Sequence, residues 1–166
     1  MGPILLVDDE PYVLRWLTWH LTRAGYRVAT AADGAAGLAR ARALRPPLIF
    51  LDARMPRLDG YTVCDALRRD PDPALAGTHV ILLSAAERPA AGAWGRPGGR
   101  PDEYLAKPCR LGEVLRRVRA VLGDPARGPA PRAAAGRGGA RVPPARRAPA
   151  APRALRASGG PAPAAA

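Results

Sequence analysis

This sequence has two cysteines that form no CxxC pair, no long apolar run and a single lysine. The first two features exclude classes of protein, and the third singles out one residue as a candidate for a functional site. Cys64 and Cys109 form no CxxC pair and show no zinc-type spacing to histidine, which excludes a disulfide scaffold and a structural zinc site. No apolar run approaches the length that spans a membrane, and residues 1–10 lack the basic start of a signal peptide. A cytoplasmic protein without membrane contact is therefore expected.

Lysine occurs once, at position 107, whereas arginine occurs 25 times. A lone lysine is most often a solvated surface residue. Arginine is used at every other basic position, however, and its planar guanidinium does not reproduce the compact point charge of an ammonium. This contrast makes Lys107 a candidate for a site that requires a point charge.

Residues 124–166 differ in composition from the rest of the chain. They consist almost entirely of alanine, proline, glycine and arginine, with eight arginines and one acidic residue, and they carry much of the formal net charge of +12. Such a stretch cannot bury enough apolar surface to offset the conformational entropy lost on folding. The sequence therefore predicts a folded domain over residues 1–123 and a disordered basic tail over residues 124–166, with no output domain folding after Gly123.

Residues 4–122 alternate short apolar runs with longer segments of helical spacing, the pattern of repeated strand–helix units around a parallel sheet. Five strands are predicted, at Ile4–Val7, Tyr26–Ala29, Leu48–Leu51, Val80–Leu83 and Tyr104–Ala106. The third and fourth runs are apolar throughout, as strands covered on both faces are. The predicted fold class is therefore α/β, with helices on both faces of the sheet.

Three helices are predicted between the first four strands, each with a residue suited to a helix terminus. The first begins at Pro11 and ends before Gly25, the second is capped by Asp33, and the third follows Gly60. Gly37 lies inside the second helix, where glycine costs about 1 kcal/mol relative to alanine. The second helix is expected to run through Ala43 and to be weakened by this glycine.

The segment of residues 85–102 stands where another helix is expected, but its prolines and glycines break any long helical run. A short or irregular helix is the most that we predict there. A last helix is predicted over Leu111–Leu122, with valines and one leucine facing the core and arginines facing solvent. The inward residues are Val114, Leu115, Val118 and Val121, and the outward ones are Arg116, Arg117 and Arg119.

Polar residues follow four of the five predicted strands. Asp8 and Asp9 follow the first strand, Asp52 the third, Ser84 the fourth and Lys107 the fifth. The carboxyl ends of parallel strands meet at one edge of a sheet, so these side chains are expected to converge. Three carboxylates repel one another unless a cation lies among them, and oxygen ligands with room for water suit Mg²⁺. One carboxylate can then attack phosphorus, while an ammonium and a hydroxyl hold the other phosphoryl oxygens.

Each of these residues also has an ordinary structural interpretation. Adjacent aspartates before a helix are more often caps than metal ligands. Ser84, taken alone, is as compatible with an ordinary strand-end hydroxyl as with a functional role. Tyr104, taken alone, is as compatible with an ordinary core aromatic as with a functional role. The combination is more specific than its parts, because an apolar strand that ends in Asp52 is followed by a Met-Pro pair and an Asp-Gly pair.

Four blocks of the sequence resemble the response-regulator receiver family. They are LLVDDEP at the first strand, LDARMPRLDG at the third, LLSA at the fourth and DEYLAKP at the fifth, and the resemblance covers about three-quarters of the chain. It implies a flavodoxin-like, doubly wound sheet of five parallel strands in the order 2-1-3-4-5. It also implies a part in a two-component phosphorelay, in which a histidine kinase or a histidine phosphotransfer protein donates the phosphoryl group.

The resemblance makes Asp52 the phosphoacceptor. It places Mg²⁺ among the carboxylates of Asp8, Asp9 and Asp52 and the backbone carbonyl of Arg54. On the same likeness Asp52 thus has two roles, as the residue that is phosphorylated and as a ligand of the metal.

The resemblance also implies how the phosphoryl group is held and sensed. Ser84 and Lys107 bind it, and the Lys107–Pro108 peptide bond is expected to be cis. Tyr104 matches the switch aromatic, whose rotation follows the pull of Ser84 on the phosphoryl group.

Leu14 and Trp19 lie off the apolar stripe of the first helix, near the acidic end of the sheet, and are expected to be exposed. Receivers dock their kinases there, so both residues are candidate partner contacts. Isolated apolar residues on a surface are nevertheless common and usually have no function.

Two functions of different classes fit the sequence. The first is a stand-alone receiver that catalyses only its own phosphorylation and dephosphorylation, is not a classical enzyme, and signals by contact with an unidentified protein. The second is a degenerate receiver whose basic tail binds nucleic acid or acidic partners. The first is favoured, because the tail lacks aromatic residues for base stacking. Nucleic acid is therefore not the expected partner.

Two further expectations complete the hypothesis. Residues 85–102 would form part of the dimerising face in the family, and their irregular sequence predicts a monomer. A phosphatase that uses a strand-one aspartate fits poorly, because such enzymes need two aspartates one residue apart, whereas Asp8 and Asp9 are adjacent.

Overall fold

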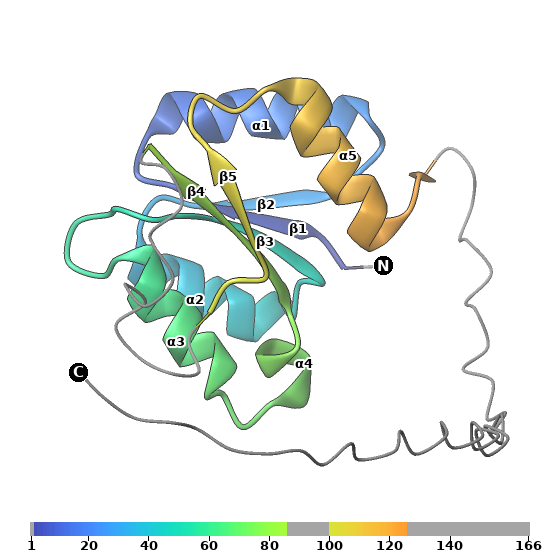
Figure 1. Cartoon of the computed structure of the whole chain (residues 1–166). Coiled ribbons are helices and arrows are strands. Elements are labelled where there is room, and N and C mark those ends of the chain that lie inside the picture. Colours follow the sequence, from blue (N-terminus) through green and yellow to red (C-terminus); the bar gives the residue numbers. More distant parts are fainter. Residues whose placement is uncertain (1, 86–99, 126–166) are drawn as a thin grey trace, which may run out of the picture. The chain divides into compact units, whose positions relative to one another are not determined.

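The computed structural model describes residues 2–85 and 100–125, drawn in colour in Figure 1. These residues form a five-stranded sheet in the order β2-β1-β3-β4-β5, in which every neighbouring pair is parallel. The predicted fold class and strand order are confirmed. The expectations of a short or irregular helix within residues 85–102 and of a disordered tail fall almost wholly outside the described residues.

The strands and helices alternate along the described part of the chain. The strands are β1 (Ile4–Val7), β2 (Val28–Ala31), β3 (Leu48–Asp52), β4 (His79–Ser84) and β5 (Glu103–Ala106). The helices are α1 (Pro11–Arg23), α2 (Gly34–Leu44), α3 (Gly60–Arg68), α4 (Pro73–Ala76) and α5 (Leu111–Leu122). None of the helices in the described ranges is both long and apolar enough to cross a membrane.

Helix α4 is absent from the sequence-based prediction and is distinct from the helix expected within residues 85–102. It is a single turn between α3 and β4. Pro73 begins it, and the side chain of Asp72 accepts a hydrogen bond from the Ala74 N–H at 2.9 Å. A proline after a capping aspartate is a standard helix start, but four residues are too few to show a helical apolar pattern.

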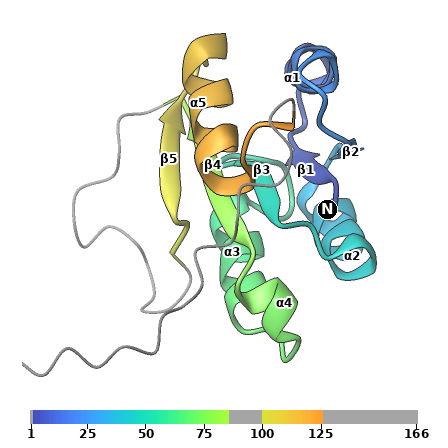
Figure 2. The same cartoon turned by 90° about the vertical axis from the view of Figure 1, so that its right-hand side faces the viewer.

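Two apolar clusters lie on opposite faces of the sheet, because successive strand residues point to opposite sides. Figures 1 and 2 show α2 and α3 on one face and α1 and α5 on the other. The α2–α3 cluster includes Leu5, Val7, Ile49, Leu51, Val63, Cys64 and Leu67. The α1–α5 cluster includes Ile4, Leu6, Leu17, Leu21, Phe50, Val114 and Val118. Strands β3 and β4 contribute to both clusters and are therefore covered on both faces, as their uninterrupted apolar runs predict.

The second strand begins two residues later than the sequence predicts. The predicted range Tyr26–Ala29 is wrong by two residues at both ends, since β2 spans Val28–Ala31. Tyr26 still belongs to the turn that ends α1, where its N–H donates to the Leu21 carbonyl at 3.0 Å. Its ring is buried, and its hydroxyl donates to the Gly123 carbonyl at 2.7 Å. This aromatic residue therefore packs between α1 and the end of α5 rather than within the sheet.

The orientation of α5 differs from the prediction at one arginine. Arg116 and Arg119 are exposed as expected, but the Arg117 side chain is only 16% exposed. Its guanidinium pairs with Glu103 of β5 and with Glu113 one turn earlier on α5. The apolar stem of arginine can cover a packed surface while its head reaches a carboxylate, so helical periodicity alone placed Arg117 wrongly.

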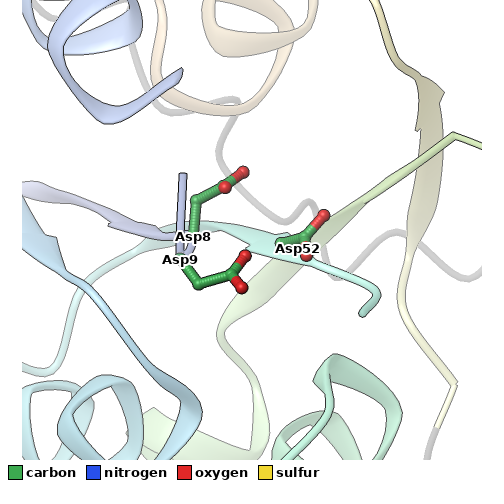
Figure 3. Close-up of side chains that lie close together, drawn as sticks. All are labelled: Asp8, Asp9 and Asp52. Carbon is green, nitrogen blue, oxygen red and sulfur yellow. The ribbon is translucent and has the colours of Figure 1, made fainter. Parts of the chain in front are cut away.

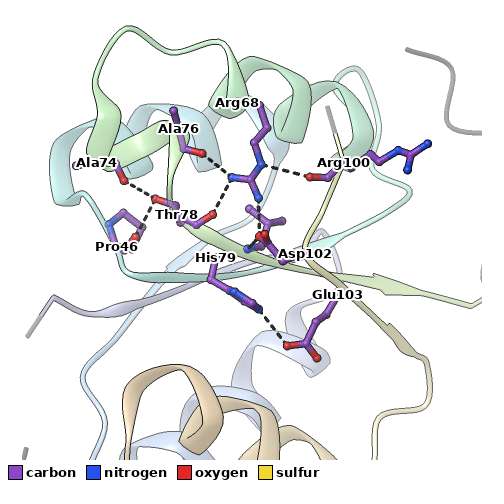
Figure 4. Close-up of polar contacts among 10 residues, drawn as sticks. Pro46, Arg68, Ala74, Ala76, Thr78, His79, Arg100, Asp102 and Glu103 are labelled. Atoms are coloured by element: carbon purple, nitrogen blue, oxygen red, sulfur yellow. Dashed lines mark hydrogen bonds and ion pairs between the residues drawn. The ribbon is translucent and has the colours of Figure 1, made fainter. Parts of the chain in front are cut away.

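Arg68 joins α3 to the segments that precede β4 and β5 (Figure 4). Its Nη1 group lies 3.0 Å from the Ala76 carbonyl oxygen and 2.7 Å from the Thr78 carbonyl oxygen. Its Nε and Nη2 groups contact the Arg100 carbonyl at 3.3 Å and the Asp102 carboxylate at 2.5 Å. One guanidinium thus joins the segment before β5 to the end of α4 and to the residue before β4.

Gly37 occupies the place where α2 crosses β1. It is buried, and a Cβ atom at this position would lie 2.6 Å from Cγ1 of Val7. The sequence predicts that Gly37 merely weakens α2. The structure shows why a glycine stands at this position: the helix backbone approaches a strand side chain too closely to leave room for a Cβ atom.

We expect Gly37→Ala to lower the free energy of unfolding by about 1–3 kcal/mol in urea denaturation, because overpacking outweighs the gain in helix propensity. Gly112→Ala is the matched control on α5, where an added Cβ meets nothing within 4 Å. That control is expected to gain about 0.5–1 kcal/mol. A similar gain for Gly37→Ala would contradict the packing argument.

Candidate functional site

Three aspartates gather at the carboxyl end of the sheet (Figure 3). Asp8 follows β1, Asp52 is the last residue of β3, and Asp9 lies beside Asp8. One carboxylate oxygen of each lies within 4.8 Å of those of the other two. Asp8 and Asp52 are buried, at 1% and 5% exposure, whereas Asp9 is exposed. The three carboxylates predicted to bind the metal therefore lie together, two in the interior and one open to solvent.

Backbone hydrogen bonds hold the two buried carboxylates. The Glu10 N–H donates to Asp8 Oδ1 at 2.9 Å, and the Arg54 N–H donates to Asp52 Oδ2 at 3.1 Å. The other oxygen of each aspartate, Asp8 Oδ2 or Asp52 Oδ1, faces Lys107. A carboxylate bound at one oxygen has little rotamer freedom left, so both aspartates are held in fixed orientations.

Gly60 lets the start of α3 approach Asp52. Its N–H donates to the Ala53 carbonyl at 3.2 Å, and a Cβ atom at this position would lie 2.2 Å from the Asp52 carbonyl oxygen. A side chain cannot be accommodated there, so glycine is required. The Asp59 side chain caps the same helix by accepting a hydrogen bond from the Thr62 N–H at 2.7 Å. The Asp-Gly pair therefore sets where α3 begins relative to Asp52.

The ammonium of Lys107 lies among three carboxylates. Its Nζ atom is 2.7 Å from Asp52 Oδ1, 2.8 Å from Asp8 Oδ2 and 3.0 Å from Glu10 Oε1. An ammonium carries three N–H groups, which matches the number of carboxylates around it. The Lys107 side chain is 14% exposed, and its backbone N–H donates to the Ser84 carbonyl at 2.8 Å. The structure thus places Lys107 beside Asp52, as the sequence predicts.

Burial and charge act in opposite directions on the pKa values of this cluster. Burial raises the pKa of Asp8, and contacts with Lys107 and the Glu10 N–H counter only part of that rise. Burial lowers the pKa of Lys107, but its contacts with Asp52, Asp8 and Glu10 outweigh burial and raise that pKa above its usual value. Lys107 therefore stays charged at physiological pH and acts as the fixed cation of the site.

The remaining predicted site residues lie on β4, on β5 and just after β5. Ser84 is the buried last residue of β4. Tyr104 is half-buried in β5 and packs against the α2–α3 cluster. The Lys107–Pro108 peptide bond is cis. Ser84 and Lys107 thus share the sheet edge with Asp52, whereas Tyr104 lies within a strand.

The donor set fits a small divalent cation. The site contains four carboxylates, those of Asp8, Asp9, Glu10 and Asp52, and one ammonium, which leaves an excess of negative charge. Mg²⁺ prefers carboxylate oxygens together with several waters. The exposure of Asp9 leaves room for those waters. Asp8, Asp9 and Asp52 are therefore the residues that could hold Mg²⁺. The expected ligation by the Arg54 carbonyl stays a prediction, since the contact found is from its N–H to Asp52.

Glu10 is the site residue that sequence reasoning misses. The LLVDDEP block draws attention to its two aspartates, and no spacing rule predicts that the next residue contacts Lys107, 97 positions away. One signal is available in the sequence. Glutamate stands directly before Pro11, at a helix N-cap where serine, threonine, aspartate and asparagine are preferred.

Comparison with protein families gives a match to the response regulator receiver domain over residues 4–119. The chain is 42% identical over 122 residues to the DNA-binding dual master transcriptional regulator RpaA of Synechocystis sp., covering 74% of this chain and 49% of that protein. It is 38% identical over 119 residues to the alkaline phosphatase synthesis transcriptional regulatory protein PhoP of Bacillus subtilis, covering 72% and 48%. The chain thus spans about half the length of the curated relatives it matches.

Solved structures of similar fold cover the same part of the chain. The chemotaxis protein CheY4 of Vibrio cholerae has a TM-score of 0.66 at 30% identity, over 74% of this chain and 99% of that chain. The receiver domain of sensor histidine kinase PA1611 from Pseudomonas aeruginosa PAO1 has a TM-score of 0.63 at 30% identity, over 74% and 98%. That structure has a magnesium ion coordinated in its active site cleft.

Mg²⁺ is expected to raise the thermal stability of the native chain, because a ligand that binds only the folded state adds about 2.7 kcal/mol at a hundredfold excess over its Kd. Asp9→Asn is expected to lose most of this rise, and without Mg²⁺ to be at least as stable as the native chain, since one repelling carboxylate is gone. Asp65→Asn on α3, outside the cluster, should keep the rise. Equal responses of native and Asp9→Asn proteins in thermal melts would contradict the metal assignment.

Proposed function

Because the chain belongs to the family of response regulator receiver domains, we propose that Asp52 accepts a phosphoryl group from a histidine kinase or a histidine phosphotransfer protein, with Mg²⁺ held by Asp8, Asp9 and Asp52. One observation carries the proposal. The buried Asp52 carboxylate has one oxygen 2.7 Å from the Lys107 ammonium and has two further aspartates beside it. The role is signalling rather than classical enzyme turnover, since the group is transferred to the protein itself.

In the proposed transfer, an oxygen of Asp52 attacks the phosphorus atom of a phosphohistidine. An oxygen–phosphorus bond forms as the phosphorus–nitrogen bond breaks, and the imidazole nitrogen keeps the electron pair of the broken bond. Magnesium, when bound, supplies positive charge to the phosphoryl oxygens. Lys107 places its ammonium against one phosphoryl oxygen, and Ser84 donates its hydroxyl hydrogen to another.

Ser84 and Tyr104 are the proposed switch residues. Movement of the Ser84 hydroxyl toward the phosphoryl group would open space beside β4, and rotation of the Tyr104 ring would fill it. Two features support this. Ser84 ends β4, and Tyr104 pairs with Leu82 in the adjacent strand while its ring packs against the α2–α3 cluster. A displacement at one strand end can therefore reach the neighbouring strand directly.

A groove along α1 is the proposed docking site for the phosphodonor protein. It has a volume of about 680 Å³ and is lined by α1 residues from Pro11 onward and by Thr30 of β2. Trp19 is 56% exposed at this groove, and the Arg23 guanidinium lies over its ring at 4.8 Å. Leu14, expected to be exposed, is half-buried and packs against the α1–α5 cluster. Trp19 is therefore the stronger candidate for partner contact.

The output of the domain is a further part of the proposal. RpaA and PhoP are transcriptional regulators by name, and this chain matches about half of their length. We propose that residues 1–123 act as a cytoplasmic monomer that signals by contact with a protein target. The pairing of Arg117 with Glu103 and Glu113 supports a monomer, since these charges are already neutralised within the chain.

Incubation with a small phosphodonor and Mg²⁺ is expected to add one phosphoryl group to the native chain and none to Asp52→Ala, as read by intact-mass spectrometry. The variant lacks the attacking oxygen, whereas Asp65→Ala on α3 should be phosphorylated like the native chain. Absence of phosphorylation from both a small donor and a kinase would contradict the proposal. It would favour a degenerate receiver that works through its basic residues 124–166, and deletion of that stretch would then abolish binding to nucleic acid or acidic partners.

Trp19→Ser is expected to slow phosphotransfer from a histidine kinase by about tenfold. Truncation of an aromatic side chain that becomes buried when the partner docks typically costs more than 1 kcal/mol of binding free energy. Its phosphorylation by a small donor should be unchanged, since Trp19 does not contact the aspartates. Leu44→Ser on α2, also an exposed apolar residue, is the matched control. If Trp19→Ser and Leu44→Ser accept phosphate from the kinase equally fast, α1 is not the docking surface.

A further inference from the structure

Glu10 sits at the junction between β1 and α1 and reaches across the site. It is the N-cap residue of α1, yet its side chain makes no capping hydrogen bond. Its Oε1 atom instead lies 3.0 Å from Lys107 Nζ. The same residue donates its backbone N–H to Asp8 Oδ1 at 2.9 Å. Glu10 therefore contacts both a candidate metal ligand and the cation of the site, through two different groups.

The absence of a capping bond makes this contact informative. Short polar side chains are preferred at N-caps because their oxygen reaches the first free N–H groups of the helix, and glutamate is too long to do so well. Glu10 thus stands where its residue type contributes little to helix stability. Its carboxylate is instead directed to Lys107, which follows β5. This contact indicates a role in the site rather than in α1.

Glu10 differs from the other two carboxylates around Lys107 in what the proposed transfer requires of them. Asp52 uses one oxygen to bond phosphorus, and Asp8 is a candidate ligand of the metal. Neither can keep its full contact with the ammonium at that moment. Glu10 has no such duty and is 61% exposed, so it can move with the ammonium as the other two contacts change.

We propose that Glu10 is a positioning residue that holds the Lys107 ammonium beside Asp52 while the phosphoryl group is transferred. The inference rests on the proposed phosphorylation of Asp52. A lysine side chain has four rotatable bonds, and an ammonium that loses a partner samples positions away from the phosphoryl oxygen. The contact with Glu10 keeps the ammonium near the phosphoryl oxygen. Glu10 therefore acts on the rate of transfer rather than on binding of the donor.

Repulsion between Glu10 and an anionic donor would act in the opposite direction. That effect is weak, because a largely exposed carboxylate is screened by water and salt. The contact with Lys107 involves a side chain that is only 14% exposed. Positioning should therefore dominate, and the two effects predict opposite changes in rate when the carboxylate is removed.

The test compares Glu10→Asn with Glu10→Gln. Glutamine keeps the length and an acceptor oxygen for Lys107, whereas asparagine is one methylene shorter and instead suits the N-cap of α1. Phosphorylation by phosphoramidate is followed by intact mass over a range of donor concentrations at saturating Mg²⁺. Glu10→Asn is expected to lower the maximal rate about threefold to tenfold, with an unchanged half-saturating donor concentration and equal or higher thermal stability.

Glu10→Gln is expected to retain most of the native rate, which a role in charge alone would not allow. Native rates for both variants, or faster rates for both, overturn the positioning role while leaving phosphorylation of Asp52 intact. A loss of rate in Glu10→Asn that tracks a loss of thermal stability overturns it as well. No phosphorylation of the native chain overturns this inference together with the proposed function.

Discussion

The placement of one ammonium among three carboxylates is the interaction on which the rest of the site depends. Lys107 Nζ lies within 3.0 Å of oxygen atoms from Asp8, Glu10 and Asp52, which come from two separate strand ends. Burial of two neighbouring aspartates without a cation would cost several kcal/mol. The same cation supplies the charge that the proposed phosphoryl transfer needs. One side chain therefore serves both the stability of the acidic cluster and its chemistry.

Lys107 directly follows β5, a strand at the edge of the sheet whose sole neighbour among the described residues is β4. Edge strands are held by one ladder of hydrogen bonds and need further support. Just before β5 the Arg68 guanidinium donates hydrogen bonds to the Asp102 carboxylate and to the Arg100 carbonyl. At its end the Lys107 N–H is bonded to the Ser84 carbonyl. Contacts at both ends thus fix the strand that presents the ammonium to Asp52.

The position of the acidic cluster was predictable because it follows from strand ends, whereas the strand order was predicted from the resemblance to the receiver family. An apolar run ending in Asp52 or followed by Lys107 sends its polar residue to the carboxyl edge of any parallel sheet. Features that depend on side-chain reach between distant segments were not predictable. Glu10 contacts a residue at the other end of the domain, and Arg117 turns from its expected solvent-facing position toward Glu103. Local sequence patterns do not specify the partner of either side chain.

The Lys107→Arg variant tests the central claim most directly, because it keeps the charge and changes only the shape of the cation. The quantity to measure is the rate of Asp52 phosphorylation by a small donor at saturating Mg²⁺, with a thermal melt to establish that the variant folds. We predict a folded protein that is phosphorylated about 100-fold more slowly, since a planar guanidinium cannot take the place of the compact ammonium between Asp52, Asp8 and Glu10 and present its charge to the phosphoryl group in the same way. A native rate in Lys107→Arg would contradict this account of the site.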